Sequence, residues 1–174
     1  MTEKFSVKTL TLLSFYAVIA LAIYGLESLI PYPFPIPGIK PGLANIISLI
    51  VLRLHGGRRA FPVLIVRILL SAFLFGSGIT LIYSLAGGIL CIIAMWGTNK
   101  LLDGKYIFIT SVIGAICHNT AQLVLAAIIT RTGYIFSYAP YLYISAVLTG
   151  LFTGLAAYYS IPRIKHILSR FDAL

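Results

Sequence analysis

Acidic residues are scarce in this sequence of 174 residues. It has only four, Glu3, Glu27, Asp103 and Asp172, and no two of them are neighbours. Chemistry on a diphosphate through Mg²⁺ depends on clustered carboxylates. We therefore do not expect the chain to be an enzyme by itself.

Other signatures of catalysis and of cofactor binding are also missing. There is no G-x-x-x-x-G-K-[ST] loop for a built-in ATPase, no nucleophile motif and no paired spacing of zinc ligands. The two cysteines, Cys91 and Cys117, both fall in apolar segments, so no disulfide framework is implied. We expect no cofactor and no metal.

Charge of either sign is rare, whereas apolar residues dominate. The sequence is 60% hydrophobic and 10% charged, with a mean hydropathy of +1.02. A soluble domain of this length cannot bury so much apolar surface. We predict an all-α integral membrane protein that forms a single transmembrane domain over residues 1–174.

Six apolar windows predict six helices, at residues 9–30, 43–54, 60–75, 79–97, 106–130 and 141–161. About 20 apolar residues span a bilayer. Four windows reach that length, whereas the second and third are short and form either short spans or an inserted hairpin. The first window resembles a signal peptide, but its apolar run continues to Ile30, so we expect a span.

The basic residues predict the orientation. If the windows alternate across the membrane, ten Lys and Arg residues fall on one face, and only Lys40 and Arg131 fall on the other. Cytoplasmic loops carry the Lys/Arg excess. We expect a multi-pass protein of the bacterial cytoplasmic membrane with both termini cytoplasmic. The net charge of +9 is then explained by orientation and lipid headgroups, with no need for nucleic acid.

A proline-rich segment, residues 31–45, separates the first two windows and reads P-Y-P-F-P-I-P-G-I-K-P-G-L-A-N. Proline excludes helix and central strand and favours an extended run. Since this outer segment holds Lys40 between Glu27 and Asn45, it is either a lid over a site or a plain loop with helix-stop prolines.

Polar side chains deep in the apolar windows predict a binding site, because such groups are costly in a membrane. Glu27 lies in the first window, Arg67 near the middle of the third, and His118, Asn119 and Gln122 near the middle of the fifth. Two simpler explanations remain open. His118 is a hydrogen-bonded core histidine, or Arg67 pairs with Glu27.

Small residues recur at four-residue spacing in the last window, at Ala146, Gly150 and Gly154. Such spacing lets helices approach closely. We favour internal packing of one bundle over a dimer seam.

These motifs resemble the bacterial Gx transporter family, also named heptaprenyl diphosphate synthase component I. The resemblance rests on the proline-rich segment, Arg67, S-L-A-G-G from Ser84 and H-N-x-x-Q from His118. This family is similar in size and hydropathy to the S components of energy-coupling factor (ECF) transporters, which are six-helix bundles that bind a cofactor precursor beneath an outer loop. The resemblance implies substrate-binding roles for Glu27, Lys40, Asn45, Arg67, Ser84, His118, Asn119 and Gln122.

Two functions follow from the two family names. As an S component, the chain binds an anionic or amphipathic cofactor precursor of the isoprenoid, quinone-precursor or flavin class, and its partners are an ECF T protein and two ATPase subunits. Alternatively, it is a non-catalytic membrane accessory to a soluble prenyl synthase subunit. A purely structural subunit of a larger complex is a third possibility. The first is preferred because the polar residues lie at mid-membrane and outside.

Overall fold

The computed structural model of the protein describes residues 6–30, 42–75 and 78–172. These residues contain six α-helices, as predicted, one short 3-10 helix and no strand. The elements are α1 (Val7–Ser28), α2 (Asn45–His55), α3 (Gly57–Phe75), α4 (Gly78–Leu101), α5 (Ile107–Thr130), η1 (Gly133–Tyr138) and α6 (Ala139–Asp172).

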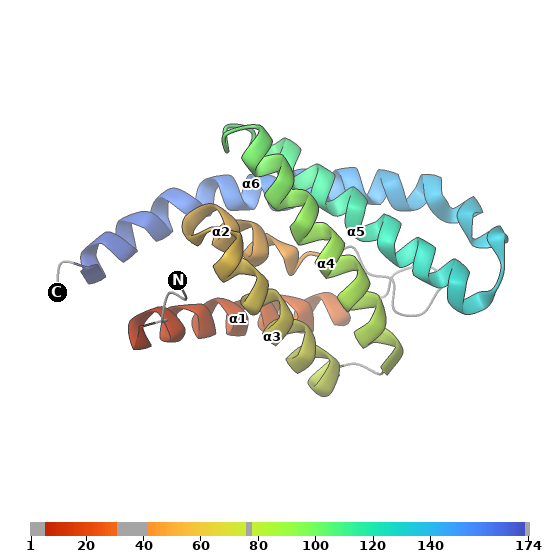
Figure 1. The fold of residues 1–174 in the computed structure, drawn as a ribbon, viewed down its shortest axis with the longest axis horizontal. Helices are drawn as coiled ribbons and strands as arrows, with labels where there is room; N and C mark the ends of the chain where they lie inside the picture. Colours follow the sequence, from red (N-terminus) through yellow and green to blue (C-terminus); the bar gives the residue numbers. More distant parts are fainter. Residues whose placement is uncertain (1–5, 31–41, 76–77, 173–174) are drawn as a thin grey trace.

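The helices form one bundle with two sides (Figure 1). Helix α5 packs along α4 on one flank and along α6 on the other, whereas α1 packs mainly on α3. Helix α2 lies between these groups and contacts α1, α3, α4 and α6. Helix α1 begins and helix α6 ends toward the same end of the bundle. We label this end the inner end and the opposite one the outer end.

Four helical stretches are long and apolar enough to cross a membrane. These are α1, α4, α5 and the stretch from η1 through most of α6, residues 133–170. Large apolar side chains point away from the bundle on several helices, and Phe73 is 86% exposed. Because the apolar surface covers both the interior and the outside of the bundle, the chain is a membrane protein.

The two short windows differ in the structure. Helix α2 has 11 residues and α3 has 19, which at 1.5 Å per residue gives lengths of about 17 Å and about 29 Å. Only α3 approaches the ~30 Å of a hydrocarbon core. It begins at Gly57, not at Ala60 as predicted, because Arg58 and Arg59 belong to its first turn and hydropathy does not detect them.

Helix α6 is much longer than its apolar window and continues past Ile161 to Asp172 with Pro162 inside it. Exposed Tyr141 and Tyr159 mark two levels along it. Their separation is about 27 Å by helix rise, close to the thickness of a hydrocarbon core. The part of α6 beyond Tyr159 therefore extends past the apolar layer, and it carries Arg163, Lys165 and Arg170.

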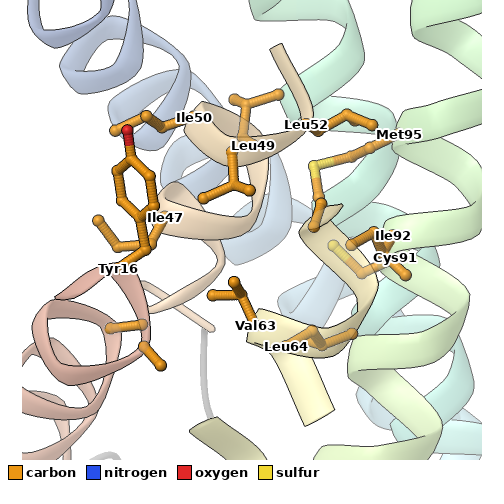
Figure 2. Packing of buried hydrophobic residues seen from close by; sticks show 14 of the residues in the cluster. Tyr16, Ile47, Leu49, Ile50, Leu52, Val63, Leu64, Cys91, Ile92 and Met95 are labelled. Atoms are coloured by element: carbon orange, nitrogen blue, oxygen red, sulfur yellow. The ribbon is translucent and has the colours of Figure 1, made fainter. Parts of the chain in front are cut away.

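The main hydrophobic core joins α1, α2, α3 and α4 toward the inner end (Figure 2) and also includes Ile107 of α5 and Ala157 of α6. Tyr16 of α1, Leu49 of α2, Leu64 of α3 and Met95 of α4 converge there and are almost fully buried. A smaller cluster at the other end includes Tyr83, Leu123, Ile135 and Leu142. The polar site lies between these two apolar layers.

The small residues of α6 face α5. A Cβ on Gly150 would lie 2.7 Å from Val112 Cα, and one on Gly154 would lie 3.2 Å from Phe108 Cα. Ala146, one turn away, is fully buried. The hydroxyls of Ser111 and Thr153 join the same two helices at 2.7 Å. The spacing thus serves close packing inside this bundle.

Candidate functional site

A carboxylate from α1 caps the start of α2. Glu27 is 1% exposed, and its Oε1 accepts a hydrogen bond from the Gly42 N–H at 2.7 Å. The N–H groups of Leu43 and Ala44 also face this carboxylate. The first N–H groups of a helix lack partners within the helix and favour negative charge. The α2 cap residue, Ala44, has no side chain for this task, and Glu27 takes it over.

Arg67 of α3 lies fully inside the bundle beside this cap. Its Nη2 donates to Asn45 Oδ1 at 3.1 Å, and its Cζ lies 6.0 Å from the centre of the Tyr24 ring. Arg67 and Glu27 attract one another electrostatically, but no direct ion pair joins them within the described part of the chain. The pairing considered from the sequence is therefore a longer-range one.

The side chain of Asn45 connects Arg67 to His118, and its amide group can have only one orientation. A guanidinium only donates hydrogen bonds, so the Asn45 carbonyl oxygen must face Arg67 and the Asn45 amide nitrogen must face the histidine. That nitrogen lies 3.2 Å from His118 Nδ1. His118 Nδ1 therefore accepts the bond and carries no proton. The histidine is uncharged and has its proton on Nε2.

Two glycines make room for the imidazole ring. A Cβ on Gly87 of α4 would lie 2.7 Å from His118 Cε1 and 2.8 Å from Nδ1. A Cβ on Gly42 would lie 2.7 Å from Asn45 Nδ2, and Gly42 also has a φ of +80°, which favours glycine. The sequence reasoning missed both glycines and Tyr24 as site residues. Gly87 lies in the S-L-A-G-G motif, which was the available signal.

Asn119 and Gln122 of α5 are buried on the side of the smaller apolar cluster. Asn119 Nδ2 donates to the Leu142 carbonyl of α6 at 2.9 Å. Asn119 Oδ1 and Gln122 Oε1 have no hydrogen-bond partner among the described residues, and neither do Glu27 Oε2 and Arg67 Nε. Each such atom is costly to bury.

The other two predicted substrate-binding residues are Lys40 and Ser84. Lys40, like the rest of residues 31–41, lies outside the described residues. Ser84 is half-buried on α4, and within the described ranges its side chain makes no hydrogen bond to the cluster. Of the eight predicted residues, Glu27, Asn45, Arg67 and His118 are brought together, with Asn119 and Gln122 adjoining on α5.

A small cavity lies beside Asn45 and Gly42. It has a volume of about 10 Å³ and is also lined by Cys91, Met95, Ser111 and Thr153. This is room for about one water molecule. A ligand of cofactor size therefore requires the surrounding side chains to move apart. Within residues 6–30, 42–75 and 78–172, no group of three or more His, Cys, Asp or Glu side chains could hold a metal ion.

Comparison with known proteins identifies the family. No curated protein and no solved structure matches the chain. The family model described as heptaprenyl diphosphate synthase component I matches residues 16–160, which is most of the chain and includes every described residue of the site. This confirms the family predicted from the motifs: the chain belongs to the heptaprenyl diphosphate synthase component I family.

Proposed function

We propose that the chain is a membrane solute-binding protein that resembles the S component of an ECF transporter. It takes up an anionic or amphipathic cofactor precursor of the isoprenoid, quinone-precursor or flavin class from the outer side of the bacterial cytoplasmic membrane. An ECF T protein and two ATPase subunits are its proposed partners, and both of its termini are cytoplasmic. The chain itself is proposed to be non-catalytic.

The observation that carries this proposal is the set of buried polar groups from four different helices. Glu27, Asn45, Arg67 and His118 meet at one level of the bundle, and four polar atoms at this site and on the adjoining part of α5 lack a partner among the residues that the structure describes. Polar groups inside a membrane bundle mark functional sites by default. A structural core would satisfy these atoms or replace them by apolar side chains.

Native mass spectrometry of the full chain purified in mild detergent tests the proposal. The wild type should retain a small molecule that Arg67→Ala loses. Arg58→Ala is the matched control, because Arg58 is exposed in the first turn of the same helix. If Arg67→Ala does not fold, Arg67→Lys keeps the charge and removes the planar guanidinium, and it should weaken retention. A wild type that carries no small molecule would contradict solute binding.

A second candidate is a non-catalytic accessory role in polyprenyl diphosphate synthesis, and the family description favours it. Under this reading a soluble prenyl synthase subunit binds on the cytoplasmic side. The basic end of α6, which extends past the apolar layer, offers a surface for such a partner. An empty chain that carries a stoichiometric soluble subunit in the same mass spectra would favour this role.

A further inference from the structure

The unpartnered atoms of the site narrow the ligand class, on the basis of the solute-binding function proposed above. Among the described residues, three of the four are acceptors: Asn119 Oδ1, Gln122 Oε1 and Glu27 Oε2, the last of which belongs to a carboxylate that faces the Leu43 and Ala44 N–H groups without a hydrogen bond of standard geometry. Only one, Arg67 Nε, is a donor. A ligand that completes these hydrogen bonds must therefore bring more donors than acceptors. A phosphate or diphosphate brings mainly acceptors.

The charges of the described groups also favour an uncharged ligand over an anion. Glu27 and Arg67 carry opposite charges that attract one another. His118 is uncharged, because its Nδ1 accepts from the Asn45 amide nitrogen. The described groups thus cancel and leave no excess positive charge for an anion. Burying a further charge without a counter-charge is costly in a membrane interior.

The helix register places a phenol near the unpartnered oxygens. Gly114 faces Cys91 and Met95, whereas Gly87 faces the His118 ring, so α4 and α5 run antiparallel. One turn further toward the outer end, this register sets Gln122 opposite Tyr83, which is buried. Aromatic and leucine side chains of the smaller apolar cluster surround that level. They suit a flat ring or a hydrocarbon chain.

From these observations we infer that the site binds a ligand whose head group is uncharged and bears hydroxyl or amide N–H donors, with an apolar body. Glu27 and Gln122 accept from the head group, and Arg67 donates to it. Within the proposed classes, the unphosphorylated alcohol, flavin or hydroquinone is the ligand, and the phosphorylated or carboxylated form is not.

Matched pairs of probes test this inference on the full chain in lipid nanodiscs. The pairs are farnesol and farnesyl diphosphate, riboflavin and its 5′-phosphate, and 1,4-dihydroxynaphthalene and its 2-carboxylate. The shift in unfolding temperature and the dissociation constant are measured for each. In any pair that binds, the uncharged compound should have a lower dissociation constant than its charged counterpart. Tighter binding of the charged member would overturn the inference and leave the proposed function standing.

Two substitutions should affect the affinity for an uncharged ligand and the affinity for an anion differently. Glu27→Gln keeps an oxygen for the Gly42 N–H but replaces Oε2 by a donor. It should weaken an uncharged, donor-bearing ligand by roughly tenfold or more, whereas it should strengthen an anion. Gln122→Glu should leave the uncharged ligand bound and weaken an anion by a similar factor. Asp103→Asn, in the turn between α4 and α5, is the control and should change neither.

Stronger binding in Glu27→Gln, or weaker binding in Gln122→Glu, would overturn the inference. If no probe binds, the compound retained in native mass spectra tests the inference instead. A phosphate or carboxylate on that compound would contradict an uncharged head group. If no compound is retained and no probe binds, the proposed function fails, and the inference fails with it.

Discussion

The inner core and the outer polar site are built from the same helices in opposite ways. In the inner core, apolar side chains from all six helices fill the space (Figure 2), and polar groups near it have partners. Tyr16 Oη lies 3.3 Å from His55 Nε2, and Arg53 Nη1 donates to Asn99 Oδ1 at 2.7 Å. At the outer site, four buried atoms have no hydrogen-bond partner within the described part of the chain. The inner layer is well packed, whereas the outer layer leaves buried polar groups without partners among the described residues, at a cost in stability.

Truncating the inner core should have the largest effect on stability. Leu64 is 1% exposed and packs against α4. Leu64→Ala should lower the free energy of unfolding by about 2–5 kcal/mol because it leaves a cavity. Chemical unfolding in detergent measures this loss. Leu101→Ala is the control, since Leu101 is 85% exposed at the end of α4 and should cost almost nothing. Equal losses at both positions would contradict the assignment of the core.

Substitutions at two adjacent glycines of α4 distinguish the polar site from the apolar core. Gly87→Ala should displace the His118 ring, break its bond to Asn45, and cost about 1–3 kcal/mol, with loss of ligand retention. A Cβ on Gly88 would instead meet the ends of Ile68 and Leu64, with the nearest atom, Ile68 Cδ1, at 2.9 Å. These ends can shift, so Gly88→Ala should cost less and keep the ligand. Thermal unfolding and native mass spectra of both variants check this, and loss of ligand in Gly88→Ala alone would reverse the comparison.

Removing one satisfied polar contact from the inner layer should have a modest effect. Tyr16→Phe keeps the ring in the core and loses only the contact with His55. The free energy of unfolding should fall by about 0.5–1.5 kcal/mol, measured by chemical unfolding. Ligand retention should be unchanged, and a change in it would mean that the two layers are coupled.

The smallest effect on stability is expected at the outer site itself. Gln122→Leu removes an unpaired buried acceptor and fills the same volume with carbon. The free energy of unfolding should stay within about 0.5 kcal/mol of the wild type or rise, because no hydrogen bond is lost. Retention of the ligand should nevertheless fall, as seen in native mass spectra. A clear destabilisation would show that Gln122 has a structural partner.

The sequence predicted the helices where hydropathy is informative and missed them where it is not. Helices α4 and α5 begin within a residue of their windows. The last turns of α6 were missed because Pro162, Arg163 and Lys165 follow Ile161 and end the apolar window, and hydropathy does not detect a helix that continues into more polar sequence. The 3-10 helix η1 was missed because it has only six residues and lies between the fifth and sixth apolar windows.

The site was predictable in part. Glu27, Arg67 and His118 stand out because ionisable groups are rare in apolar windows, and Asn45 stood out through the family motif. Gly42, Gly87 and Tyr24 did not, because their roles depend on what faces them across the bundle. A glycine in the sequence does not indicate which side chain will occupy the space beside it in the structure. The role of Lys40 remains a prediction.

The fit between Gly87 and His118 also limits how this family can evolve. The imidazole occupies the space that any side chain at position 87 would need. A larger residue at 87 is therefore tolerated only after residue 118 has become smaller, and that change removes the acceptor for Asn45. Position 87 should therefore change only in relatives in which position 118 has also changed. Relatives with alanine at 87 should then lack histidine at 118.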